Sequence, residues 1–202
     1  MSRVTDLAEL DALYGAPVPA SLAKVADRVI PTYRALIEAA PFCVLATSGP
    51  GGVDASPRGD APGFVHVEDE RTLMLPDRRG NNRGDSLRNL VADPRLALLF
   101  LIPGVGETLR VNGTGEVHAG PALCERFAVQ GRAPRTVLVV RVAEVYFQCS
   151  RAVLRARLWD PEGRVDRASL PTPGRILAEA SAGRIGAEYD EGLQERLRAN
   201  LY

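Results

Sequence analysis

The sequence has few of the residues that usually build metal centres and disulfide frameworks. Only two histidines and three cysteines occur in 202 residues, and no two cysteines form a CxxC pair. This pattern indicates neither a zinc site nor a disulfide framework, so we expect no bound metal. Basic and acidic residues number 25 each, so the chain lacks the overall positive charge that binds nucleic acids by counterion release. Lys24 is the only lysine; the excess of arginine suits phosphate binding but also fits a GC-rich genome.

Long hydrophobic runs are also missing. The first ten residues carry acidic side chains and contain no apolar stretch, which is not the pattern of a secretory signal. The longest apolar run, Leu96–Ile102, is far too short to span a bilayer. We therefore expect a cytoplasmic protein that binds neither a membrane nor a nucleic acid.

Hydrophobic periodicity divides the chain into three parts. Residues 1–40 are expected to form a helical extension, with a helix that starts at Ser21 and is kinked or divided by Pro31. Residues 41–161 contain about six short apolar or alternating segments, which predict strands. Residues 162–202 are expected to form a helical tail that packs on this central domain.

The short links between the predicted strands favour an antiparallel sheet, because a parallel crossover needs a dozen or more residues. Such a sheet must close into a barrel or stack as a sandwich to hide its edges. Gly113 and Gly115 predict a bulge or a tight bend in the strand that starts near Thr108. The expected fold class is therefore mainly β, a barrel with peripheral helices.

The segment that most clearly suggests chemistry is Pro76–Arg88, between a predicted strand and a short helix. Before the helix it carries three arginines, Arg78, Arg79 and Arg83, with two asparagines and a serine beside them. A helix N-terminus attracts anions through its free N–H groups and its dipole, and arginine adds bidentate hydrogen bonds. The segment thus predicts a phosphate site, in which Asp85 turns away and pairs with an arginine. The alternative is a capped helix start with surface arginines, since neither a P-loop nor a GxGxxG pattern is present.

Three further segments place polar or aromatic residues where a ligand could contact them. Ser56 and Arg58 lie two residues apart and share one face of a predicted strand. Thr108 begins a strand with polar residues on one face, and Trp159 follows Arg157 in a pair that suits a planar anionic ligand. Each has a plain alternative: a turn with an internal salt bridge, a solvent-facing strand, and a core or interface tryptophan.

Together, in order and spacing, these four segments resemble the pyridoxamine 5′-phosphate oxidase-like, FMN-binding split-barrel family. The motifs are S-P-R-G-D at Ser56–Asp60, P-D-R-x-G-N-N-R-x-D-S-L-x-N at Pro76–Asn89, F-L-I-P-G-x-x-E-T-L-R-V-N-G at Phe100–Gly113, and R-A-x-L-W at Arg155–Trp159. The similarity covers about Pro41 to Pro161. It implies a six-stranded antiparallel split barrel and a homodimer with flavin at the subunit interface.

The resemblance also implies FMN as the cofactor and a role for each site residue. The phosphate would be held by Asn82, Arg83 and Ser86, with help from Arg58 or Arg78 and with Ser56 on the same strand face as Arg58. The isoalloxazine ring would lie over Leu75, Pro76 and Asp77, near Thr108, with Arg157 and Trp159 reaching across from the second subunit.

Two departures from the true oxidases narrow the expected function. Arg157-Leu158-Trp159 stands where those enzymes have Arg-Leu-His, and no lysine follows Lys24, so we do not expect pyridoxal phosphate synthesis. The expected function is that of an FMN-dependent oxidoreductase on an unidentified small molecule, with no catalytic acid or base identified. The alternatives are a non-catalytic carrier or sensor of flavin, of deazaflavin F420 or of haem. Scarce histidine argues against haem, and F420 would need a basic groove beyond the phosphate site.

Overall fold

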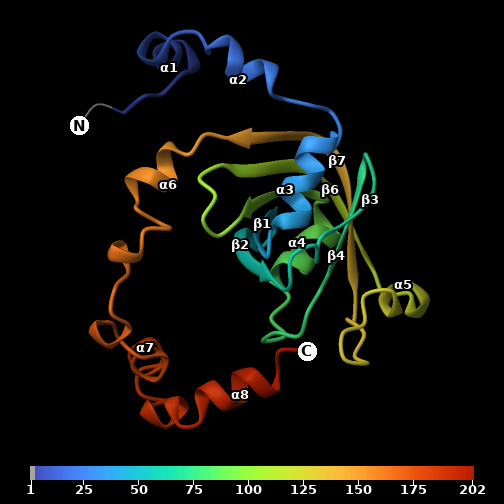
Figure 1. Ribbon diagram of the computed structural model, residues 1–202. Helices are drawn as coiled ribbons and strands as arrows, with labels where there is room; N and C mark the ends of the chain where they lie inside the picture. The colour runs from blue at the N-terminus through green and yellow to red at the C-terminus, as the bar shows by residue number, and fades with distance from the viewer. Residues whose placement is uncertain (1–2) are drawn as a thin grey trace.

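One antiparallel sheet of seven strands forms the centre of the protein, whose computed structural model describes residues 3–202 (Figure 1). The strands are β1 (Phe42–Gly49), β2 (Gly52–Gly59), β3 (His66–Asp69), β4 (Thr72–Pro76), β5 (Arg95–Leu101), β6 (Thr108–His118) and β7 (Val137–Gln148). They follow the spatial order β2-β1-β5-β6-β7-β4-β3. The sheet thus has one strand more than the expected six, and β3 pairs with β4 on either side of the acidic turn.

The core lies on one side of this curved sheet and is closed by helix α3 (Pro31–Ala39). Burial alternates along β1 and β5, so every second side chain of these strands enters the core. Helix α3 adds Tyr33 and Ile37, and Ile37 is completely buried. Burying a side chain of that size stabilises the fold by about 1.5–3 kcal/mol, which fixes α3 against the sheet.

The helix predicted to start at Ser21 is two separate helices with an extended segment between them. Helix α2 (Pro19–Ala23) ends early, and Ala26 then pairs with Val145 of β7 through two main-chain hydrogen bonds of 3.0 and 2.8 Å. Pro31 begins α3 at its first position, where the missing N–H costs nothing. The predicted division at Pro31 is thus confirmed, while helix continuity before it is wrong.

The irregularity predicted at Gly113 is present as a bulge, but the extra residue, Ala143, lies on β7 opposite it. The register between β6 and β7 shifts between Asn112 and Gly113. A side chain at Gly113 would collide with the main-chain oxygen of Arg141 on β7, so the two backbones approach closely only because this residue is glycine. The extra residue increases the local twist of the two longest strands and helps the sheet to curl.

Helix α4 (Asp85–Ala92) is anchored on the β1–β2 hairpin by a buried asparagine. The Asn89 amide donates to Thr47 Oγ1 at 3.2 Å and to the main-chain oxygen of Gly52 at 3.3 Å. Gly49 leaves the space for this contact, since a Cβ there would meet Asn89. These contacts fix the direction of α4 and hence the position of its N-terminus.

Beyond the sheet, the helices form an N-terminal arm (residues 3–23), a C-terminal arm (residues 151–202) and one short helix between β6 and β7. Helix α5 (Pro121–Glu125) packs Cys124 against β4 and β7. Helix α1 (Leu7–Tyr14) buries no side chain. After α6 (Arg151–Arg155) the tail runs through η1 (Pro161–Gly163), η2 (Arg167–Ser169), α7 (Pro173–Ala180), η3 (Ala187–Asp190) and α8 (Leu193–Ala199).

The tail differs from the expected packing on the central domain. It arcs away from the sheet and returns at its end (Figure 1). Helix α8 buries no residue, and α7 buries only Gly174. Among the helices of residues 3–202, none combines the length and the hydropathy needed to cross a membrane.

Candidate functional site

A cavity of about 1000 Å³ lies where the ends of β2 and β4 meet the start of α4. Its walls come from residues 56–59, 76–87 and 132–136, together with Phe64 and Tyr202. The volume is at the upper end of the range for small-molecule sites. We call this cavity the pocket. Segments far apart in the sequence thus form one concave surface.

Six arginines line the pocket: Arg58, Arg78, Arg79, Arg83, Arg132 and Arg135. Three of them pair with carboxylates, Arg58 with Asp77, Arg78 with Asp60 and Arg83 with Asp85. The other three make no ion pair with any carboxylate of residues 3–202. The pocket therefore carries an excess of positive charge, which favours an anionic ligand.

Ser86 is the buried centre of a polar network that joins α4 to β2. Its hydroxyl donates to Asp54, and Asp54 also accepts a 2.9 Å hydrogen bond from the Ser56 hydroxyl. Arg58 Nη2 donates to Ser86 Oγ at 3.3 Å. Ser86 is 2% exposed, so this network fixes both the hydroxyl and the guanidinium at the wall of the pocket.

The first turn of α4 leaves its N–H groups without a side-chain cap. The residue before the helix, Gly84, has a left-handed conformation with φ of 66° and makes no capping hydrogen bond. Arg83 Nε donates to Asp85 Oδ2 at 2.8 Å, which confirms the expectation that Asp85 pairs with an arginine. The uncapped helix start is hence available to a bound anion.

Asp77 adds a carboxyl group to this positive environment. Burial raises the pKa of Asp77, and the nearby Arg58 and Arg135 guanidiniums offset only part of that rise. The main-chain N–H of Asp77 donates to the main-chain oxygen of Thr136 at 2.9 Å, so this donor belongs to the sheet rather than to the pocket. The side chain, not the backbone N–H, is the group that Asp77 offers to a ligand.

One buried polar atom in the pocket wall lacks a partner within residues 3–202. It is Thr136 Oγ1, at the start of β7. Leaving a buried hydroxyl unpaired costs about 1–3 kcal/mol, and such groups in native proteins usually mark a missing partner. The orphaned hydroxyl, the uncapped helix and the arginines that make no ion pair with a carboxylate of residues 3–202 together fit a phosphorylated ligand with further polar groups.

Eight of the twelve residues expected to bind the cofactor line this pocket. They are Ser56, Arg58, Pro76, Asp77, Arg78, Asn82, Arg83 and Ser86. Of these, Arg78 donates to Asp60 at 2.6 Å and to the main-chain oxygen of Phe127 at 2.6 Å, so its guanidinium braces the wall. Leu75 is buried in the core immediately before the pocket.

Thr108, Arg157 and Trp159 lie outside the pocket of their own chain. Thr108 starts β6 opposite Gln148. The Trp159 indole donates to the main-chain oxygen of Val105 at 2.7 Å, close in sequence to Thr108. Arg157 pairs with Asp160 at 2.6 Å. Trp159 is thus attached to the loop that precedes Thr108, and all three residues lie apart from the pocket of their own chain.

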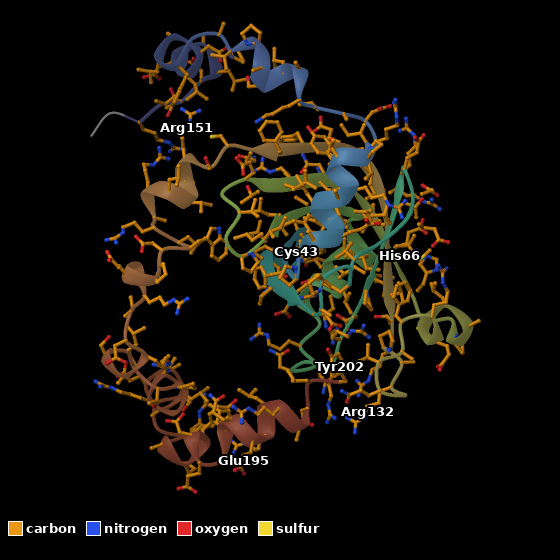
Figure 2. The ribbon with its side chains drawn as sticks, viewed as in Figure 1. Cys43, His66, Arg132, Arg151, Glu195 and Tyr202 are labelled. Atoms are coloured by element: carbon orange, nitrogen blue, oxygen red, sulfur yellow. The ribbon has the colours of Figure 1, made fainter. Side chains whose placement is uncertain are left out.

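Sequence reasoning did not identify Arg132, Arg135, Thr136 and Tyr202 as site residues. Arg132, Ala133, Pro134 and Arg135 immediately precede β7, whose first residue Val137 pairs with Pro76. That pairing brings the two arginines beside the phosphate segment, and it could not be read from the sequence. Figure 2 shows Arg132 and Tyr202 next to each other, and Arg132 Nη1 donates to the main-chain oxygen of Tyr202 at 2.6 Å.

Comparison with known proteins identifies the family. The model of the pyridoxamine 5′-phosphate oxidase family matches residues 29–149, which is more than half of the chain. The chain belongs to the pyridoxamine 5′-phosphate oxidase family. The match spans all seven strands and helix α4, and thus includes nearly all of the pocket. No curated protein matches the sequence.

Solved structures similar to this member of the pyridoxamine 5′-phosphate oxidase family share little sequence with it. HupZ from Group A Streptococcus is 18% identical, with a TM-score of 0.49 over 60% of this chain and 95% of its own. An FMN-binding protein from Syntrophomonas wolfei is 11% identical, with a TM-score of 0.42 over 56% and 86%. A FAD-binding protein from Mesorhizobium loti is 14% identical, with a TM-score of 0.41 over 61% and 94%.

The raised pKa of Asp77 predicts a pH-dependent effect on stability. A carboxyl whose pKa is higher in the folded than in the unfolded state destabilises the fold at pH values above its folded pKa and has no effect below its unfolded pKa. Asp77→Asn should therefore raise the melting temperature at pH 7, by about 2–4 °C for each kcal/mol regained, and the gain should vanish near pH 3. Thermal unfolding at both pH values measures this.

Asp85→Asn is the matched control, because the Asp85 side chain is 44% exposed and its pair with Arg83 lies at the surface. An exposed pair contributes at most about 1 kcal/mol, and we expect no gain at pH 7. Equal melting temperatures for Asp77→Asn and the unmodified protein at pH 7 would show that the arginines fully compensate for the burial of Asp77.

Proposed function

We propose that this chain is an FMN-binding flavoprotein that acts as an oxidoreductase on a small molecule. The observation that carries the proposal is the meeting of three anion-binding features in one pocket: the uncapped start of α4, the buried Ser86 hydroxyl and the guanidiniums of Arg58 and Arg83. A phosphate monoester uses all three, since helix N–H groups and arginine forks both match its oxygens. Membership of the pyridoxamine 5′-phosphate oxidase family supports FMN as that phosphate.

In this proposal the network around Ser86 is rearranged by the ligand. The Ser86 hydroxyl now donates to Asp54, and a phosphate oxygen would replace Asp54 as the acceptor. Asp54 would keep its hydrogen bond from Ser56, so no buried carboxylate is left alone. Arg58 lies between Ser86 and Asp77 and would separate the phosphate from the Asp77 carboxyl.

The remaining wall suits the flavin ring and its chain. Phe64 and Pro76 give the pocket apolar surface, and the orphaned Thr136 hydroxyl can meet a polar group of the ligand. When bound, FMN supplies hydride transfer. The surrounding arginines lower the energetic cost of negative charge on the ligand.

Binding of FMN to variants of the phosphate site tests the proposal. We expect the unmodified protein to bind FMN, with the quenched fluorescence and shifted absorption band of an enclosed flavin. Arg83→Ala and Ser86→Ala each remove a hydrogen bond to a charged group, worth about 1.5–3 kcal/mol, and should weaken FMN binding roughly ten- to hundredfold.

Arg34→Ala is the matched control for this titration. Arg34 pairs with Glu38 on the surface of α3, away from the pocket, and its loss should leave FMN binding unchanged. The proposal fails if the unmodified protein binds no flavin, or if Arg83→Ala and Ser86→Ala both bind FMN as tightly as Arg34→Ala.

We further propose a homodimer in which each pocket is completed by the partner. Thr108, Arg157 and Trp159, which the family resemblance assigns to the ring, lie outside the pocket of their own chain. The arms also expose large apolar side chains, with Leu7 76% exposed and Ile176 54% exposed. Exposed apolar surface on this scale favours association. A second copy would cover it and bring these residues to the flavin.

Light scattering of the FMN-bound protein should give twice the mass of the chain. Trp159→Ala should weaken FMN binding in the dimer, although Trp159 does not line the pocket of its own chain. A monomer that still binds FMN tightly would contradict the shared site.

A second candidate is a carrier or enzyme that uses deazaflavin F420. The observation that favours it is the positive charge beyond the phosphate segment, where Arg132 and Arg135 make no carboxylate pair within residues 3–202. The longer anionic tail of F420 would bind along such a basic groove. The mass of the cofactor that purifies with the protein distinguishes the two, and turnover with a nicotinamide donor distinguishes an enzyme from a carrier.

A further inference from the structure

We propose that Tyr202 is a latch that docks the C-terminal tail on the pocket and slows the release of the cofactor. The inference rests on the proposed binding of FMN and assigns a retention role to a segment outside the part of the chain matched by the family model, which ends at residue 149. Tyr202 lines the pocket although about forty residues of tail separate it from the sheet domain.

Three contacts hold Tyr202 against the pocket wall. Its hydroxyl donates to Asp60 Oδ1 at 2.6 Å. Its ring lies beside the Arg78 guanidinium, 5.7 Å from ring centroid to Cζ. Its main-chain oxygen accepts a 2.6 Å hydrogen bond from Arg132, and Figure 2 labels the two residues beside each other. Each partner of Tyr202 belongs to the pocket or directly braces it.

Asp60 is a buried, fixed hydrogen-bond acceptor for the Tyr202 hydroxyl. Its side chain is only 5% exposed, and it accepts from Arg78 Nε, from the Ala61 N–H and from Tyr202. Burial acts to raise the pKa of Asp60, but these donors outweigh burial and hold the pKa below its usual value. Asp60 therefore stays ionised, and a charged acceptor makes the hydroxyl bond stronger than one between neutral groups.

The rest of the tail gives Tyr202 little help in staying docked. Within the described chain, the hydrogen bonds of residues 164–201 stay inside the tail. The upstream attachment is the bond from Trp159 to Val105. Tyr202 is thus the residue through which the end of the tail contacts the sheet domain. Its contacts decide whether the tail stays docked on the pocket.

Tyr202 forms a wall of the pocket and does not plug it. With Tyr202 in place the pocket still encloses about 1000 Å³, room for a whole mononucleotide. Tyr202 also contacts Arg78 and Arg132, two of the arginines that line the pocket. A docked tail therefore narrows the exit while leaving the site available, which is the behaviour of a latch.

The rate of FMN release measures the latch. FMN-loaded protein is diluted far below its dissociation constant for FMN, so that released FMN does not rebind, and release is followed by the rise in flavin fluorescence. Tyr202→Ala should release FMN about tenfold faster, since it loses a charged hydrogen bond and a cation–π contact. Tyr202→Phe keeps the ring, so its rate of FMN release should lie between that of Tyr202→Ala and that of the unmodified protein. The melting temperature of the FMN-free protein should be unchanged in both variants.

Tyr189→Ala is the matched control, because Tyr189 lies in the same tail and stacks on Arg196 away from the pocket. Its FMN release should equal that of the unmodified protein. If Tyr202→Ala releases FMN at the same rate as the unmodified protein, Tyr202 is not a latch. If Tyr202→Ala releases FMN more slowly, Tyr202 obstructs the pocket instead of retaining the cofactor. Failure of the proposed function has a different result: the unmodified protein itself takes up no FMN, and the latch falls with it.

Discussion

The concentration of like charge in one pocket is the constraint on which the rest of the structure depends. Six guanidiniums share a cavity, and three carboxylates pair with only half of them. Such a surplus is tolerated because the charge of a guanidinium is delocalised and only weakly hydrated, and because Asp60, Asp77 and Asp85 each pair with one of the arginines. The same surplus favours an anionic ligand in the pocket. The same clustered positive charge therefore lowers the stability of the empty protein and raises its affinity for an anionic ligand.

The pocket arginines come from segments that are far apart in the sequence, and the fold places the ends of these segments side by side. The end of β2 supplies Arg58, the end of β4 leads into the phosphate segment, and the loop before β7 supplies two arginines. Buried Asn89 and Ser86 fix α4 to the β1–β2 hairpin and to Asp54. These polar anchors are satisfied within the protein, so the helix start keeps its direction while its N–H groups remain free for a ligand.

Local chemistry could be predicted from the sequence, and long-range pairing could not. The gathering of polar residues at the start of α4, the pairing of Asp85 with an arginine and the bulge opposite Gly113 follow from spacing and residue type. The helix expected from Ser21 failed because Ala26 pairs with Val145, more than a hundred residues away. Arg132 and Arg135 were missed for the same reason, since only the pairing of β4 with β7 places them at the pocket.

The most direct test of the central claim is the crystal structure of the protein with FMN. The account predicts that the FMN phosphate lies at the start of α4, within hydrogen-bond reach of Ser86 and Arg83, with the ring toward Pro76. A phosphate bound elsewhere, with the Ser86 hydroxyl still donating to Asp54, would contradict it.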